Sequence, residues 1–398
     1  MARLYGNGNP MKVLAVFGTR PEAIKLAPVI RQLKADPRFE VIGASTGQHR
    51  EILHAVTERF GIHPDFDLGL MESGQSLSSF LARCVTGLDR VLAEVQPQAV
   101  IVQGDTTSAL AGAIAGFHRK VDIAHLEAGL RTGDLYSPFP EEGNRKMISQ
   151  VSQLHLAPTP SAKQNLIGEG VPGGRIVITG NTVIDALDIA AGWEVEFADS
   201  RISKAVESER PIILVTSHRR ENLGEMDGIG RAIRAVATRY PDFQLVLPLH
   251  PNPMVRNPIE SEVKGVENIL VTAPLPYDQF TGLMKSAALI LTDSGGIQEE
   301  APALGVPVLV MRSNTERPEA LEAGTVKLIG SDWAGIVSEV SHLLDNQESY
   351  RKMVHAVNPY GDGLAAARTV AALAQLGGVG ERLPDFSPSI GTRSGLGA

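Results

Sequence analysis

Short apolar runs alternate with longer helical patterns along almost the whole chain, and this alternation limits the fold more than any other feature. Predicted strands in the first half are residues 12–17, 40–46, 99–103, 122–126, 154–157 and 176–179. Those in the second half are residues 212–216, 244–249, 268–271, 289–292, 306–310 and 326–328. Many are apolar at nearly every position, which is typical of parallel strands covered by helices on both faces. The pattern predicts an α/β fold built from βαβ units.

These strands are too many for one open sheet. A mostly helical, charged segment at residues 185–210 separates the two series. We therefore expect two doubly wound, Rossmann-like domains, at residues 11–187 and 205–363, that face each other across a cleft. The ends of the chain, residues 1–10 and the Gly-, Ser- and Pro-rich residues 377–398, are predicted to be poorly ordered tails.

Charge and cysteine content exclude several classes of function. The 398 residues include 37 Lys and Arg against 45 Asp and Glu, and no basic tract is present, which argues against nucleic-acid binding. The longest apolar runs are far too short to cross a bilayer. The single Cys84 excludes an internal disulfide and a zinc site built on several thiolates. The start of the sequence lacks the apolar core of a signal peptide, so we expect a cytoplasmic protein.

Ligands of doubly wound folds bind beyond the carboxyl ends of the strands, so the residues that follow the strands are the candidates for a site. Gly18-Thr-Arg-Pro-Glu follows the first strand and opens a helix. Arg20 at the strand end and Lys25 one turn later could both reach an anion near the helix N-terminus. Both could equally be solvated surface charges.

Three consecutive connections at the same predicted sheet edge each contain an acid: Asp105, Glu127 and Glu141. Each has a structural alternative, because acids are favoured at helix caps and in first helical turns. Their convergence at one edge points instead to a site that removes and returns protons. The residues do not decide which acid serves which face of a substrate.

Cationic and glycine-rich segments follow the strands of the second half. His218 comes with two arginines after residues 212–216, a combination suited to a phosphate group. A helix start at Ser294, Gly295 and Gly296 lets backbone N–H groups approach a phosphate closely. Glu300 could accept hydrogen bonds from ribose hydroxyls, and Arg317 adds a further cation. Taken singly, each could be a helix cap or a solvated charge.

An ordered set of motifs spans the chain from about residue 11 to about residue 376. In order they are FGTRPEAIK (17–25), TGQHR (46–50), QGDTT (103–107), HLEAGLR (125–131), PEEGNR (140–145), TGNTVID (179–185), HRREN (218–222), TDSGGIQEEAP (292–302) and TERPEA (315–320). Together they resemble the bacterial non-hydrolysing UDP-N-acetylglucosamine 2-epimerases. The resemblance covers nearly the whole chain, and a set of this length and order is highly specific.

The resemblance implies the two-domain fold of GT-B glycosyltransferases, with the last helix, at about residues 364–376, packed back on the first domain. It implies interconversion of UDP-GlcNAc and UDP-ManNAc in cell-surface polysaccharide biosynthesis, by a homodimer that uses neither NAD nor a metal. The implied chemistry is anti elimination of UDP to give 2-acetamidoglucal, followed by re-addition.

The residues that match the family's site fall into three groups. The implied catalytic residues are Asp105, Glu127, Glu141 and His218. The implied UDP ligands are Arg20, Lys25, Phe280, Ser294, Gly295, Gly296, Glu300 and Arg317. A second UDP-GlcNAc site, used for activation in many bacterial members, is matched in part by Gln48, His49, Arg219 and His250.

Other activities fit the same motifs. One is epimerisation of a related UDP-acetamido sugar, and another is a hydrolysing epimerase that releases free ManNAc and UDP. A GT-B-type glycosyltransferase would need an acceptor, whereas epimerisation needs none. A UDP-sugar sensor would bind without turnover.

Overall fold

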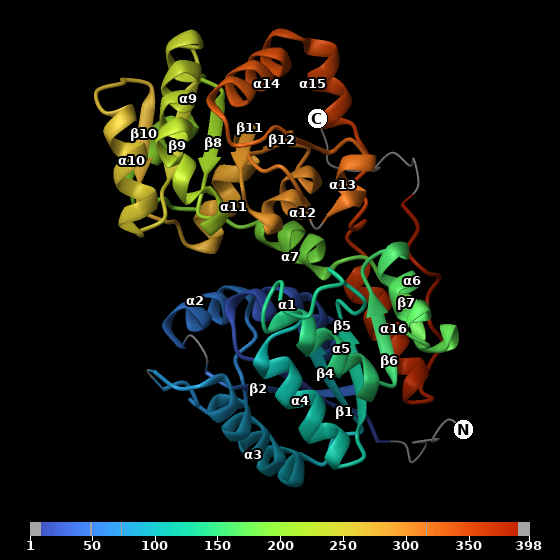
Figure 1. The fold of residues 1–398 in the computed structure, drawn as a ribbon. Helices are drawn as coiled ribbons and strands as arrows, with labels where there is room; N and C mark the ends of the chain where they lie inside the picture. The colour runs from blue at the N-terminus through green and yellow to red at the C-terminus, as the bar shows by residue number, and fades with distance from the viewer. Residues whose placement is uncertain (1–8, 48–49, 73, 316, 389–398) are drawn as a thin grey trace. The chain divides into compact units, whose positions relative to one another are not determined.

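The computed structural model describes residues 9–47, 50–72, 74–315 and 317–388. The chain divides into two compact units (Figure 1). Unit 1 comprises residues up to 186 together with residues 360–387, and unit 2 comprises residues 187–359. The predicted α/β class is confirmed, since each unit contains one parallel sheet with helices between its strands.

Unit 1 is built on a seven-stranded sheet in the order β3-β2-β1-β4-β5-β6-β7. All neighbouring strands described in it are parallel. The strands are β1 (Met11–Phe17), β2 (Phe39–Ser45), β3 (Phe66–Asp67), β4 (Ala99–Gln103), β5 (Asp122–Leu126), β6 (Leu154–Ala157) and β7 (Ile176–Ile178).

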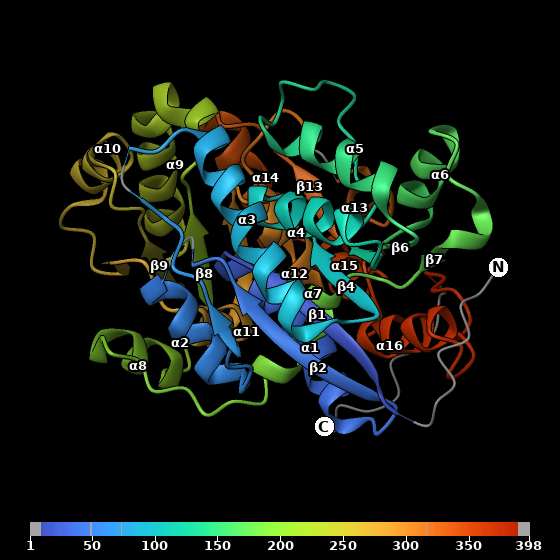
Figure 2. The same cartoon turned by 90° about the horizontal axis from the view of Figure 1, so that it is seen from below.

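Helices cover both faces of this sheet. They are α1 (Arg20–Ala35), α2 (Arg50–Phe60), α3 (Leu77–Val95), α4 (Thr107–His118), α5 (Glu141–Val151), α6 (Pro160–Gly168) and α16 (Ala365–Leu376). Helix α7 (Thr182–Ala190) contains the boundary between the two units. Apolar residues of α3 and α4 pack on Leu14 and Val16 of β1 in one buried cluster. Cys84 lies in this cluster, where burial raises the pKa of its thiol to about 12 and makes it a poor nucleophile. Helix α16 packs against α1 and β6 (Figure 2).

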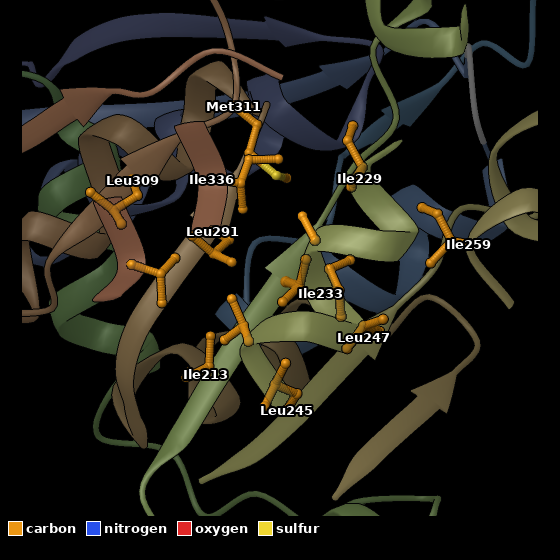
Figure 3. Packing of buried hydrophobic residues seen from close by; sticks show 14 of the residues in the cluster. Ile213, Ile229, Ile233, Leu245, Leu247, Ile259, Leu291, Leu309, Met311 and Ile336 are labelled. Atoms are coloured by element: carbon orange, nitrogen blue, oxygen red, sulfur yellow. The ribbon is translucent and has the colours of Figure 1, made fainter. Parts of the chain in front are cut away.

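Unit 2 contains a six-stranded parallel sheet in the order β10-β9-β8-β11-β12-β13. Its strands are β8 (Ile212–Thr216), β9 (Gln244–Pro248), β10 (Ile269–Thr272), β11 (Ala287–Thr292), β12 (Val308–Val310) and β13 (Val326–Leu328). Its helices are α8 (Ser200–Glu207), α9 (Met226–Arg239), α10 (Pro253–Val263), α11 (Tyr277–Lys285), α12 (Gly295–Ala303), α13 (Pro318–Glu322), α14 (Trp333–Asp345) and α15 (Gln347–Val354). Figure 3 shows the core, in which Ile213 and Leu245 of the sheet pack with Ile233 of α9 and Ile336 of α14.

Two local features differ from the sequence-based prediction. Strand β3 is only two residues long, too short to show a strand pattern in the sequence. The segment after residue 377 was expected to be poorly ordered, yet it packs on unit 1 as far as it is described. The backbone N–H of Phe386 donates to Ile178 at 2.7 Å, and its ring is buried. Asp385 pairs with Lys163 at 2.8 Å, so one apolar and one charged anchor order an otherwise polar tail.

Each sheet reverses its strand order at one place, between β1 and β4 in unit 1 and between β8 and β11 in unit 2. The connections that leave such neighbouring strands diverge to opposite faces and leave a crevice at the carboxyl edge. The residues that follow these strands are therefore the strongest candidates for a ligand site. None of the helices described combines the length and apolar content that crossing a membrane requires.

Candidate active site

Two neighbouring connections at the reversal point of unit 1 bear candidate residues. Arg20 is the first residue of α1, just after β1, and its side chain is exposed. Asp105 lies in the turn between β4 and α4 and is half-buried. Because β1 and β4 are hydrogen-bonded neighbours, the fold brings these two sequence-predicted residues to adjacent positions on one sheet edge.

The carboxylate of Asp105 is fixed from helix α5. Arg145 donates to its Oδ2 from Nε at 2.8 Å and lies 2.6 Å away through Nη2. Asn144 donates to the Asp105 backbone carbonyl at 2.8 Å. Burial lowers the pKa of Arg145, but Asp105 and the buried Glu142 outweigh it and raise that pKa overall. Asp105 therefore sits in a charge-assisted pair with a permanently charged partner.

Glu127 follows β5 in a strained backbone conformation, with φ of +64°. Such values are uncommon outside glycine and are typical of functional positions. Lys25 Nζ lies 2.7 and 2.6 Å from the two Glu127 carboxylate oxygens, and Gln103 also donates to this carboxylate. Lys25, predicted as a ligand for the UDP phosphates, is thus paired with a candidate catalytic acid.

Glu141 opens helix α5 and is half-buried. Its neighbour Glu142 accepts from the backbone N–H groups of Thr132 and Gly133 at 3.2 and 3.3 Å, which ties the preceding loop to the helix. Within the described part of the chain, Glu141 itself has no hydrogen-bond or ion-pair partner. It differs in this from Asp105 and Glu127 and can change its protonation state without breaking an ion pair.

In unit 2 a buried aspartate orients His218 at the reversal point between β8 and β11. Asp293 accepts from Ser217 Oγ at 2.9 Å, from the backbone N–H groups of His218 and Arg219 at 2.9 and 3.0 Å, and from Asn222 at 3.2 Å. Its Oδ1 lies 3.1 Å from His218 Nδ1. Burial raises the pKa of Asp293, but the bonds from the His218 ring and from the two backbone N–H groups outweigh it and bring the pKa to about 2. Nδ1 therefore donates to Asp293, and Nε2 is the nitrogen available to a ligand.

The start of helix α12 has the features of an anion site. Ser294 precedes it, and among the described contacts its side chain does not cap the helix. A Cβ at Gly295 would lie 2.5 Å from Arg317 Nη1 and 3.3 Å from Arg219 Nη2, so two guanidinium groups cover the first residue of the helix. Arg317 is held by Glu299 at 2.6 Å. A helix N-terminus beside two arginines favours a phosphate group.

The other predicted residues lie as follows. The Glu300 carboxylate stands over Gly296, at 3.6 Å from the position of a Cβ there. Phe280 lies half-buried in α11. The rings of His250 and His218 stack with centroids 6.4 Å apart, so the second-site candidate His250 lies beside the predicted catalytic histidine. The candidate Arg219 directly follows that histidine in the sequence. Gln48 and His49 lie outside the described residues.

Sequence reasoning missed the residues that hold the predicted ones in place: Gln103, Glu142, Arg145 and Asp293. Each belongs to a motif already singled out, and Asp293 directly follows strand β11. That position was a usable signal, because residues at strand ends gather at the ligand edge. The pairing of Arg145 with Asp105 could not be read from the sequence, since the two residues lie 40 positions apart.

Comparison with known proteins shows what the chain as a whole is similar to. Residues 31–374 match the family model described as UDP-N-acetylglucosamine 2-epimerase. The chain is 49% identical over 370 residues to a UDP-N-acetylglucosamine 2-epimerase of Escherichia coli (strain K12), with 91% of this chain and 98% of that protein covered.

Two solved structures share the fold. A UDP-GlcNAc 2-epimerase from Neisseria meningitidis, bound to UDP-GlcNAc, is 46% identical, with a TM-score of 0.82 over 92% of this chain and 100% of that one. An S. aureus protein in a co-structure with UDP is 41% identical, with a TM-score of 0.84 over 95% of this chain and 100% of that one. Near-complete coverage at such identity leads to one conclusion: the chain belongs to the UDP-N-acetylglucosamine 2-epimerase family.

Proposed function

We propose that this protein interconverts UDP-GlcNAc and UDP-ManNAc by inverting C2 of the sugar, without releasing the free sugar. The observation that carries the proposal is the placement of three carboxylates after β4, after β5 and at the start of α5. Two of them are held in ion pairs, and the third has none among the residues that the structure describes. The family relatives named for this activity support it, as do the relatives solved with UDP-GlcNAc and with UDP.

The chemistry requires more than one acid or base. In the forward half-reaction a base takes the C2 proton, the C1–oxygen bond to UDP breaks, and a C1–C2 double bond forms, giving 2-acetamidoglucal and UDP. In the second half a proton returns to the opposite face of C2 while a UDP oxygen bonds to C1. Groups on two faces are needed, and Asp105, Glu127 and Glu141 can supply them.

We assign proton cycling to Glu141 and one of the two ion-paired acids. In the described part of the chain, Glu141 has no ion-pair partner to lose when it exchanges a proton. Lys25 and Arg145 keep charges fixed beside Glu127 and Asp105, which gives a site able to stabilise developing charge without reorganisation.

We assign stabilisation of the leaving group, UDP, to residues of unit 2. Breaking the C1–oxygen bond places charge on the diphosphate, and the α12 N-terminus, Arg219 and Arg317 form a cationic environment suited to that charge. His218 presents Nε2 because Asp293 occupies Nδ1, so its ring can donate a proton or hydrogen bond to the departing oxygen.

Turnover in D₂O should place deuterium at C2 of the product, because the abstracted proton exchanges with solvent before a proton returns. The assay is proton NMR of purified protein with UDP-GlcNAc alone. Appearance of UDP-ManNAc supports the proposal, free ManNAc with UDP would indicate a hydrolysing epimerase, and no turnover would point to a transferase or a sensor. Epimerisation without label at C2 would rule out proton abstraction as the mechanism.

Replacing Asp293 by asparagine should lower kcat by about 10-fold or more. The amide NH₂ replaces one acceptor oxygen by a donor, whereas the backbone N–H groups of His218 and Arg219 need an acceptor there. Because the pKa of Asp293 is lower in the folded protein than in the unfolded chain, its ionised form stabilises the fold. This stabilisation is fully present above the ordinary pKa of 3.8 and is lost as the pH falls through about 2. The stability difference between the two proteins should therefore shrink toward pH 2. Ser217→Ala, which removes only one of these bonds, is the matched control. Equal kcat in Asp293→Asn and Ser217→Ala would refute the orienting role.

A further inference from the structure

Glu22, in the first turn of α1, is fully buried and binds two different loops through its two oxygens. Oε2 accepts from the backbone N–H groups of Gly18 and Thr19 at 3.0 and 2.7 Å and from the Thr19 hydroxyl at 2.7 Å. Oε1 accepts from the Thr106 hydroxyl at 2.6 Å. One carboxylate thus joins the connection after β1 to the connection after β4.

These contacts exceed what a helix cap requires. A glutamate at the third helical position ordinarily bonds the N–H of the capping residue, here Thr19, and does so at the surface. Burying a carboxylate is costly unless its hydrogen bonds are satisfied. The bond to Thr106 spans 84 residues of sequence and crosses the reversal point of the sheet, which a local cap would not do.

A close approach of Gly18 also brings the same two connections together, beside a hydrogen bond from the connection after β2 to α4. Thr46 and Ser108 share a hydrogen bond of 2.7 Å between their side-chain oxygens. A Cβ at Gly18 would lie only 2.1 and 2.2 Å from those two oxygens, so the turn after β1 packs directly on the first turn of α4. The two connections therefore lie in close contact as well as being linked through Glu22.

Residues of two other elements also bind the turn that contains Asp105. The ring of His125 is neutral, because burial lowers its pKa to about 3, and its Nε2–H donates to the Gly104 carbonyl at 2.7 Å. Arg145 holds the Asp105 carboxylate. The bonds from His125 and Arg145 hold the Asp105 turn to β5 and α5. Among these described bonds, the one from Thr106 to Glu22 connects it to the turn before Arg20.

We propose that Glu22 is a positioning residue that locks the turn bearing Asp105 to the turn bearing Arg20. The inference rests on the proposed function, in which Asp105 belongs to the acids that act at C2, and on the sequence motifs, which imply that Arg20 binds UDP. A carboxylate that touches neither group then sets the spacing between them, and small displacements of such groups cost large factors in rate.

Thr106→Val tests the link with little change in shape. It removes the hydroxyl that donates to Glu22, while the bonds from Gly18 and Thr19 to Glu22 stay. We expect kcat for epimerisation to fall about 10-fold or more, with the Kd of UDP changed by less than about twofold because Arg20 keeps its turn. Thr106→Ser retains the hydroxyl and should restore kcat.

Thr106 also caps helix α4, accepting from the Ala109 N–H at 3.0 Å, so the loss of a cap needs its own control. Thr159→Val makes the same substitution at the N-cap of α6, where Thr159 accepts from the Ala162 N–H at 3.2 Å. Both valine variants should lose thermal stability through the cap, Thr106→Val more so because Glu22 also loses a donor, and Thr159→Val should keep kcat. An equal loss of kcat in the two would show that only the cap matters and would overturn the proposal.

A double-mutant cycle adds a second measurement. In Glu22→Gln the amide carbonyl can still accept from Gly18 and Thr19. Its NH₂ then faces Thr106 and can donate to the hydroxyl but cannot accept from it, so the bond from Thr106 to a carboxylate is lost. Since both substitutions break the same link, their effects on kcat should not multiply, and the double variant should resemble the more affected single variant. Multiplicative losses would contradict a shared link.

Backbone amide exchange separates this proposal from the proposed function. The N–H groups of Gly18 and Thr19 should exchange about 10-fold faster in Thr106→Val than in the parent, and should be unchanged in Thr159→Val. That result holds whatever the reaction is, whereas a parent protein inactive on UDP-GlcNAc would refute the proposed function alone. Unchanged exchange together with normal kcat in Thr106→Val and Glu22→Gln would overturn the positioning role.

Discussion

Replacing Glu141 by glutamine is expected to lower kcat by about 10²-fold or more, the usual scale for loss of a general acid or base. The amide keeps the shape of the side chain, and in the described structure no ion pair or hydrogen bond of Glu141 is lost with the charge. Thermal stability and UDP affinity should therefore change little. Steady-state kinetics by NMR, thermal denaturation and calorimetric UDP binding measure the three quantities.

Glu94→Gln provides the matched control, because Glu94 is an exposed glutamate near the end of α3. Glu127→Gln should also lower kcat by about 10²-fold or more, but it leaves the Lys25 ammonium without its carboxylate and should cost stability as well. Near-normal kcat in both Glu127→Gln and Glu141→Gln would show that the acids are assigned wrongly.

Gly129→Ala is expected to destabilise unit 1 by about 2–6 kcal/mol, through backbone strain and overpacking together. Gly129 has φ of +91° and lies two residues after Glu127. A Cβ there would lie 2.2 Å from the Ala162 backbone oxygen and 2.8 Å from its carbonyl carbon. Backbone atoms at the start of α6 cannot move aside cheaply, so the melting temperature should drop by roughly 5–20 °C.

Gly170→Ala separates the two causes. Gly170 has φ of +86°, similar to that of Gly129, but no described atom lies within 4 Å of a Cβ at that position. It should show the backbone penalty alone, about 1–2 kcal/mol. If scanning calorimetry gives the two variants equal losses, the close approach of Ala162 contributes nothing to the need for glycine at residue 129.

The sequence was sufficient to predict the class of fold and to place the candidate site residues at strand ends. Buried parallel strands must be apolar on both faces, so their positions stand out as continuous apolar runs. Parallel strands also present their carboxyl ends at one edge, so that Asp105 after β4 and His218 after β8 could be assigned to ligand edges without coordinates. Strand β3 was not predicted, because a strand of two residues shows no periodic pattern in the sequence.

What each polar side chain touches was decided by the tertiary structure. A lysine one turn into a helix suits a phosphate as well as a carboxylate, and only the tertiary structure brought Lys25 to Glu127, 102 residues away. The order of the segment near Phe386 likewise depends on a contact with Ile178, across more than half of the chain. Apolar periodicity is a local property that a sequence displays directly. Charge pairing joins residues distant in the chain, and their partners are set only when the sheets bring the strand ends together.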